Sequence, residues 1–255
     1  MILSMMEKHG ESNAVVADKG CGALLSLAGN NADNQKKIAE AGGIDMVLRM
    51  MEVHGASDAE VAREGCGTLW NLSYNNGDNQ KMIAEAGGIA MILRMMEVHG
   101  ASDAEVAEWG CGALSNLACN ADNQQRIAEV IAMILRMMEV HGASNAGVAA
   151  DGCAALGNLA ANDDNQQRIA DAGGIAMILR MMVVHGALNA GVVEYGCGAL
   201  MSLAYNDDNS KSIGEAGGIA MILSMMEVHG ASNADVARLG CGALWSLAYN
   251  NADNK

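Results

Sequence analysis

The feature that most constrains this chain is an internal repeat of 42 to 45 residues. Histidines, from His9 to His229, recur at the same intervals as a set of cysteines that share one local context. These cysteines are Cys21, Cys66, Cys111, Cys153, Cys197 and Cys241. Self-similarity at such a period is typical of proteins in which each repeat is one supersecondary unit packed on its neighbours. We therefore read residues 1–255 as a single repeat domain.

The repeat boundaries follow from the stretch that begins with Asp-Asn-Gln. A partial repeat occupies residues 1–33, and the repeats that follow are 34–78, 79–122, 123–164, 165–208 and 209–255. One copy is shorter, because residues 127–133 read IAEVIAM where other copies read IAEAGGIAM. This loss removes the Gly-Gly pair that separates two predicted helices elsewhere.

Each repeat is predicted to hold three helices and no strand. In one copy the first helix runs from Asn79 to about Ala86, and the second from Ile89 to His99 with apolar residues at helical spacing. The third begins at Ser102, which has capping-box spacing to a glutamate three residues later. We expect the glycine that follows the histidine, Gly100, to end the second helix in the left-handed conformation.

Such a unit buries its apolar face only by stacking on its neighbours, which predicts an all-α solenoid. The composition agrees, with 51% hydrophobic residues and no proline. A formal net charge of −15 disfavours nucleic acid and anionic membranes as partners. No apolar run is long enough to span a membrane and no secretory signal is visible. With an odd cysteine count, this predicts reduced thiols and a cytoplasmic or nuclear location.

The stretches NADNQKKIAEAGGIDMVLRMM and VAEWGCGALSNLA resemble the armadillo (ARM) repeat over essentially the whole chain. The resemblance implies a right-handed superhelix of about six three-helix repeats whose third helices line a concave groove for extended peptides. The groove asparagine of that family matches Asn71, Asn116 and Asn158, and Ser26, Ser202 and Ser246 stand at this position in the other copies. Four residues earlier, peptide-binding members carry a tryptophan. This chain has instead Gly22, Gly67, Gly112, Ala154, Gly198 and Gly242.

The aromatic residues fall on one face of the predicted third helices, opposite the apolar face. They are Trp70, Tyr74, Trp109, Tyr195, Tyr205, Trp245 and Tyr249, and the chain has no phenylalanine. Half-exposed packing against the next repeat would explain such positions without a ligand. Tyrosine and tryptophan are also common anchors in interfaces, so the pattern favours a partner-facing surface.

The same face is predicted to be acidic. It holds three bases, Lys19, Arg63 and Arg238, against a larger set of acids. These acids are Asp18, Glu60, Glu64, Glu105, Glu108, Asp151, Glu194 and Asp235. Simple solvation of an exposed helix face is the alternative explanation. An acidic groove attracts basic segments, and the aromatic rings add cation–π contacts with Arg or Lys.

Other patterns predict neither a metal site, a cofactor nor catalysis. Each repeat offers a histidine and a cysteine, such as His99 and Cys111, whereas a structural zinc site needs four converging ligands. The Gly-Cys-Gly stretch lies inside a predicted helix, so its glycines indicate close helix contact rather than a phosphate loop. Cys119 is the exception among the cysteines, because it falls on the aromatic face, where we expect an exposed thiol that could be reactive.

The sequence thus predicts a non-catalytic protein-interaction scaffold that binds an extended basic segment in the third-helix groove. Asn71, Asn116 and Asn158 would bond the ligand backbone, as the resemblance implies, and Glu64, Glu105 and Glu108 would attract it. The alternative is a structural module without a peptide ligand. Because neither end carries a polar capping repeat, such a module would form a homo-oligomer end-to-end or head-to-tail.

Overall fold

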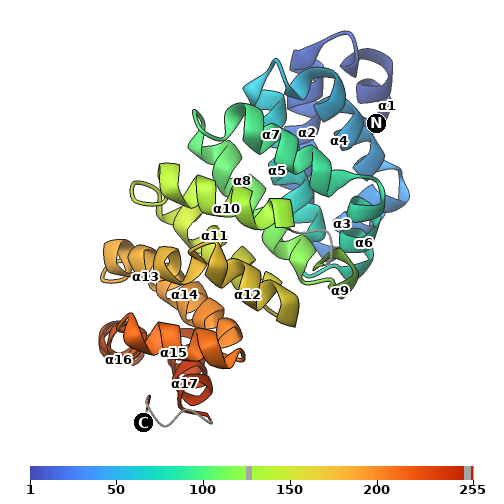
Figure 1. The fold of residues 1–255 in the computed structure, drawn as a ribbon. Coiled ribbons are helices and arrows are strands. Elements are labelled where there is room, and N and C mark those ends of the chain that lie inside the picture. Colours follow the sequence, from blue (N-terminus) through green and yellow to red (C-terminus); the bar gives the residue numbers. More distant parts are fainter. Residues whose placement is uncertain (125–127, 250–253, 255) are drawn as a thin grey trace. The chain divides into compact units, whose positions relative to one another are not determined.

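The computed structural model describes residues 1–124, 128–249 and 254, and no strand occurs among them. Helices fill the described chain apart from short turns, which confirms the all-α prediction. The chain divides into two compact units, Met1–Gln125 and Arg126–Lys255, which we call the N-terminal and C-terminal units. Figure 1 shows the helices of each unit stacked in chain order.

Three-helix repeats build both units. The N-terminal unit contains α1 (Ile2–Met5), η1 (Met6–Gly10), α2 (Ala14–Ala28), α3 (Ala32–Glu40), α4 (Gly43–Met50), η2 (Met51–Gly55), α5 (Ala59–Ser73), α6 (Gly77–Glu85), α7 (Gly88–His99), α8 (Ala104–Ala118) and α9 (Ala121–Gln124). The segments η1 and η2 are single π-helical turns that end the second helices of the first two copies.

The C-terminal unit repeats the pattern. It contains α10 (Ala128–His141), α11 (Ala146–Leu159), α12 (Asp163–Asp171), α13 (Gly174–His185), α14 (Ala190–Leu203), α15 (Asp207–Glu215), α16 (Gly218–His229) and α17 (Ala234–Ala248). Helix α10 has 14 residues against 12 in α7, in the copy that lacks the Gly-Gly pair. Ile127, which opens the shortened stretch, lies outside the described residues.

The third helices are α2, α5 and α8 in the N-terminal unit and α11, α14 and α17 in the C-terminal unit. The N-cap of α8 is Asp103, one residue later than the Ser102 that the capping-box spacing indicated. Asp103 caps α8 by accepting from the backbone N–H groups of Glu105 and Val106, at 2.9 and 3.2 Å. The hydroxyl of Ser102 donates instead to the His99 carbonyl at 3.1 Å. The predicted cap was wrong because the carboxylate of Asp103, the next residue, can accept hydrogen bonds from both N–H groups.

The left-handed glycine also lies elsewhere. Gly100 has a φ of −59°, so the expected C-terminal conformation is wrong. Gly87 between the first and second helices has a φ of 85°, and Gly42, Gly173 and Gly217 are equivalent to it. That turn needs glycine because other residues avoid positive φ.

The glycine after the histidine serves a different purpose, which Gly55 illustrates. A Cβ on Gly55 would lie 2.5 Å from Sδ of Met95 in the next repeat. Its carbonyl accepts a hydrogen bond from Nε2 of His99, 2.7 Å away, and the pairs His54–Gly10, His185–Gly142 and His229–Gly186 repeat the contact. Glycine and histidine together therefore join consecutive second helices.

Buried amides join the repeats at the first helices. Asn79 donates to the Leu72 carbonyl at 2.8 Å, and Gln35 donates to the Asn71 carbonyl of the next repeat at 2.9 Å. The Asn-Gln motif that marks the repeat therefore satisfies carbonyls at the ends of third helices, which would otherwise be buried without partners.

Within each unit, the third helices of consecutive repeats make the most extensive contacts between helices. Methionine and other aliphatic side chains fill the core, and all the aromatic residues lie outside it. None of the described helices has the length and apolarity needed to cross a membrane. The packing leaves one side of the third helices uncovered by other helices of the same unit, and the candidate site lies on this side.

Candidate functional site

We call the uncovered side of the third helices, with the turns that follow them, the third-helix face. The helical spacing predicts the aromatic side chains on this face, and most of them are exposed. Tyr205, Trp245 and Tyr249 are 62%, 60% and 60% exposed, and Tyr74 and Tyr195 are also exposed. Because aromatic rings are costly to leave in water, exposure of this kind is a property of partner-binding surfaces.

Two tryptophans of the N-terminal unit are already packed. The ring of Trp109 in α8 lies over Gly67 in α5, where a Cβ would come within 2.5 Å of the ring carbon Cε3. The ring of Trp70 in α5 lies over Gly112 in α8, where a Cβ would come within 2.7 Å of Cε2. Both rings are half-buried. Gly67 and Gly112, which stand at the position of the family's groove tryptophan, thus make room for a tryptophan from the neighbouring repeat.

The groove asparagines bond neighbouring helices. Asn71 Nδ2 donates to the Leu25 carbonyl at 3.0 Å, and Asn116 Nδ2 donates to the Trp70 carbonyl at 3.0 Å. Asn158 is half-buried at the same position in α11. In Asn71 and Asn116, one side-chain N–H therefore donates a hydrogen bond within the protein. The second N–H and the side-chain oxygen are the atoms left to meet a ligand.

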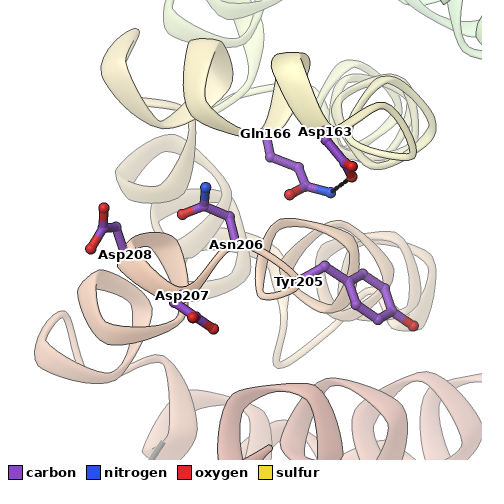
Figure 2. Close-up of a pocket in the computed structure, with 6 residues that line it drawn as sticks. All are labelled: Asp163, Gln166, Tyr205, Asn206, Asp207 and Asp208. Carbon is purple, nitrogen blue, oxygen red and sulfur yellow. Dashed lines mark hydrogen bonds between the residues drawn. The ribbon is translucent and has the colours of Figure 1, made fainter. Parts of the chain in front are cut away.

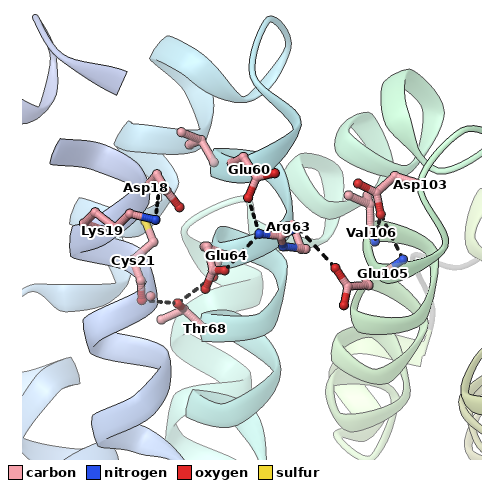
Figure 3. A network of polar contacts seen from close by, with 12 residues as sticks. Asp18, Lys19, Cys21, Glu60, Arg63, Glu64, Thr68, Asp103, Glu105 and Val106 are labelled. Atoms are coloured by element: carbon pink, nitrogen blue, oxygen red, sulfur yellow. Dashed lines mark hydrogen bonds and ion pairs between the residues drawn. The ribbon is translucent and has the colours of Figure 1, made fainter. Parts of the chain in front are cut away.

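The acidic side chains of the N-terminal unit surround one arginine (Figure 3). Arg63 contacts Glu60, lies 3.5 Å from Glu64 and bridges to Glu105 on α8 at 3.1 Å. Two of the predicted attracting carboxylates, Glu64 and Glu105, are therefore compensated inside the protein. Glu108 is half-buried on α8.

Burial raises the pKa of Glu64, and the nearby Asp18 adds to the effect while Arg63 opposes it. Asp18 is itself buried and paired with Lys19 at 2.7 Å. In the C-terminal unit, burial and then the charge of Asp235 raise the pKa of Glu194. Both carboxyls remain acids whose charged form is disfavoured by lost hydration.

The C-terminal unit presents a stacked aromatic pair and a pocket. The Trp245 and Tyr249 rings have centroids 5.3 Å apart and planes tilted by 36°. Figure 2 shows the pocket, an open hollow of about 550 Å³ where the turn after α14 faces the start of α12. Its lining residues are Asp163, Gln166, Tyr205, Asn206, Asp207 and Asp208.

Sequence reasoning missed the pocket's carboxylates. Asp163 Oδ1 accepts a hydrogen bond from Nε2 of the buried Gln166 at 3.3 Å, and Asp207 and Asp208 are exposed in the first turn of α15. A signal existed, because residues 162–164 and 206–208 read Asn-Asp-Asp where residues 31–33 read Asn-Ala-Asp. This extra acid is easily overlooked in the repeat, because the acid replaces a residue that has no structural role of its own.

No protein-family model and no curated protein sequence matches the chain. Solved structures do match. An engineered protein has a TM-score of 0.81 at 19% identity, over 97% of each chain. A designed armadillo repeat protein has a TM-score of 0.80 at 18% identity, over 97% of this chain and 100% of its own.

This chain has an armadillo repeat fold. Another match is a designed armadillo repeat protein in complex with the peptide (KR)4, with a TM-score of 0.77 at 16% identity, over 96% of this chain and 98% of its own. At these identities the likeness concerns the fold. The three-helix armadillo repeat predicted from the Asn-Gln and Gly-Gly motifs is confirmed, and its third helices carry the surface described above.

The buried cysteines and the histidines that bond a glycine carbonyl have structural surroundings, whereas Cys119 and Cys241 are exposed. Among residues 1–124, 128–249 and 254, no group of three His, Cys, Asp or Glu side chains is placed to hold a metal ion. Burial raises the pKa of Cys66 and Cys153 to about 12, so these thiols stay protonated. Cys119 is exposed, as expected, but partial burial raises its pKa too, which disfavours a reactive thiolate.

Proposed function

We propose that this protein is a non-catalytic scaffold whose third-helix face binds an extended, basic polypeptide segment. The observation that carries the proposal is the distribution of aromatic residues. All of them are absent from the core, and five of the seven are exposed on the third-helix face. A core built without aromatics, together with exposed rings on one face, is what a surface selected for binding would show.

The charge of the chain supports a basic ligand. Acids outnumber bases by 30 to 15, and the helical spacing assigns eight of these acids to the third-helix face against three bases. A surface of this sign speeds encounters with positive segments, and the exposed rings offer cation–π contacts to Arg and Lys. A designed armadillo repeat protein of similar fold was solved in complex with the peptide (KR)4, and this supports the proposal of a basic ligand.

Tryptophan fluorescence tests this function directly. All three tryptophans lie on the third helices, so a ligand there changes their environment. We expect a saturable change with a pool of basic peptides that weakens as salt is added, and none with an acidic pool of equal length. Equal responses to both pools, or none to either, would contradict the proposal and favour a structural module.

Trp245→Ala provides the matching variant. Trp245 is 60% exposed, so its removal should leave far-UV circular dichroism unchanged while it weakens binding of the basic pool by about tenfold, as expected for an aromatic anchor. Exposed Val228 on α16 is the control position. It lies on a second helix, away from the third-helix face, and Val228→Ala should bind the basic pool as the wild type does.

A further inference from the structure

We propose that copies of this chain associate head-to-tail, with α1, η1 and α2 of one copy packed on α16 and α17 of another as consecutive repeats pack within the chain. The inference concerns a second copy of the protein and goes beyond the binding of a peptide. We call the two surfaces the N-face and the C-face. The N-face consists of Met5, His9, Gly22 and Leu27, and the C-face of Leu223, Met226, Gly230, Cys241 and Trp245.

The C-face exposes side chains that other repeats bury. Leu223 on α16 is 48% exposed, whereas Leu179 at the same position of α13 is 8% exposed. Met226 is partly exposed and Cys241 is exposed, although the equivalent methionine and cysteine are buried in the other repeats. Because each repeat buries its apolar face only against a neighbour, these side chains mark the side on which a following repeat would pack.

The N-face exposes the opposite side of the repeat. Met5 is 46% exposed and Leu27 on α2 is 44% exposed, whereas the equivalent Met50 and Leu72 are fully buried. Met50 shows what covers this position, since its side chain packs against Gly10 in the preceding repeat. The N-face therefore has the side chains that a preceding repeat would cover, and the C-face has the surface that would cover them.

The exposed Trp245 of the C-face has a matching glycine on the N-face. Trp245 stands at the position of Trp70, whose ring lies over Gly112 in the following repeat. Met201 of α14 holds the same position and packs in the same way on the repeat that follows it. Gly22 is the equivalent of Gly112 in α2, so a second copy can place Gly22 under Trp245. An unrelated apolar partner would have no reason to match this spacing.

The polar contact that joins second helices is also left open on the two faces. Four histidines bond the carbonyl of a glycine in the preceding repeat, whereas the His9 ring and the Gly230 carbonyl have no such bond among the described residues. Methionine belongs to the same contact, because Sδ of Met225 lies 2.5 Å from a hypothetical Cβ on Gly186. In the head-to-tail pair, the His9 ring bonds the Gly230 carbonyl and Met5 packs on Gly230.

A second copy matches both faces, because one chain carries both halves of the contact on different surfaces. The histidine and methionine lie on the N-face, and the glycine carbonyl and tryptophan lie on the C-face, so two like faces cannot form the same bonds. The association is therefore heterologous, and each added copy leaves one face of each kind open. With a formal charge of −15 per chain, added salt should strengthen this association, whereas it should weaken the binding of a basic peptide.

The test measures weight-average mass against protein concentration by sedimentation equilibrium. In about 0.3 M NaCl, the mass should rise above that of one chain between about 5 and about 500 µM. The tryptophan emission maximum should shift to shorter wavelength over the same range, because Trp245 leaves water for the Gly22 surface of a second copy. A mass that stays at one chain throughout, or an emission maximum that does not move as the mass rises, would overturn the inference.

Two variants and their mixture identify the faces. Met5→Glu alters only the N-face and Leu223→Glu only the C-face. Each replaces a side chain that is about half exposed, so we expect both variants to keep the far-UV circular dichroism of the wild type. Each variant alone should stay monomeric. An equimolar mixture should form a dimer, since each variant supplies the face that the other lacks.

Val98→Glu on α7 is the matched control. Val98 is 48% exposed and its equivalents in the later repeats are exposed too, so this variant adds the same charge and should associate as the wild type does. If Met5→Glu or Leu223→Glu alone associates as the wild type does, or if their mixture remains monomeric, head-to-tail pairing is overturned. Peptide titrations need protein below the concentration at which the mass rises, so that Trp245 is open to the ligand.

Discussion

At the residue scale, glycine has the most specific roles in this protein. The glycines of the Gly-Cys-Gly stretch were expected to allow close helix contact, and the structure shows what makes that contact. Gly65 faces Met51 of its own repeat, with Sδ 2.6 Å from a hypothetical Cβ, whereas Gly67 faces Trp109 of the next repeat. Two glycines two residues apart thus receive one side chain from within the repeat and one from outside it.

Gly67→Ala should destabilise the protein by about 1–3 kcal/mol, because the new methyl group would displace the Trp109 ring and overpacking costs about that much. Urea unfolding, with the tryptophan emission spectrum of the native state, measures both effects. Gly198→Ala is the matched control at the same position of α14. There the nearest side-chain atom, Cδ1 of Leu239, is 3.7 Å away, so the helix-propensity gain of up to about 1 kcal/mol should prevail. Equal effects at the two positions would contradict the packing argument.

At the element scale, three sets of hydrogen bonds join each repeat to its neighbour. Histidines link consecutive second helices, buried amides link the first-helix starts to the ends of third helices, and Asn71 and Asn116 link third helices. The residues that define the repeat in the sequence are therefore largely those that bond one repeat to the next. These bonds between repeats account for their recurrence along the chain.

His99→Ala should lower the free energy of unfolding by about 1–2 kcal/mol, since the Gly55 carbonyl, 2.7 Å from Nε2, would lose its partner in a buried setting. Thermal and urea unfolding provide the measurement. His9→Ala is the control, because the His9 ring is exposed and has no hydrogen bond among the described residues. It should change stability by less than about 0.5 kcal/mol. A loss as large as that of His99→Ala would show that the inter-repeat bond is not the cause.

At the scale of the whole molecule, the main electrostatic feature is the excess of acidic over basic residues. The chain carries a formal charge of −15, and several of its ion pairs are exposed, so they contribute little. We expect added sodium chloride, from about 10 mM to about 300 mM, to raise the urea midpoint because screening reduces the repulsion among excess carboxylates. A fall over this range would mean that local ion pairs such as those of Arg63 outweigh the net repulsion.

Much of the fold could be predicted from the sequence because it depends on local rules. The repeat period, the three helices and the Gly-Gly turns follow from helical spacing and backbone preference, and the bounds of α7 agree with prediction to one residue at each end. The same spacing predicts one common side for the aromatic residues, and their absence from the buried core agrees with it. Nothing beyond neighbouring residues on one helix was needed for these predictions.

Features that depend on contact between repeats could not be predicted in this way. Asp103 rather than Ser102 caps α8 because its side-chain oxygen is the one that reaches the backbone N–H groups. The role of Gly100 and its equivalents is decided by contacts with the next repeat. The distinction between packed Trp109 and exposed Trp245 likewise depends on the facing residue.

The sequence by itself therefore determined the repeat, its helices and the face that carries the rings, because hydrogen bonds and periodicity within one helix set them. Only the tertiary structure decided which of those rings and carboxylates are already satisfied by a neighbour. It also brought Asp163 to the same pocket as Asp207, from the start of the preceding first helix. The physical reason is that stacking places equivalent positions of successive repeats side by side, so small differences between copies become differences in exposed chemistry.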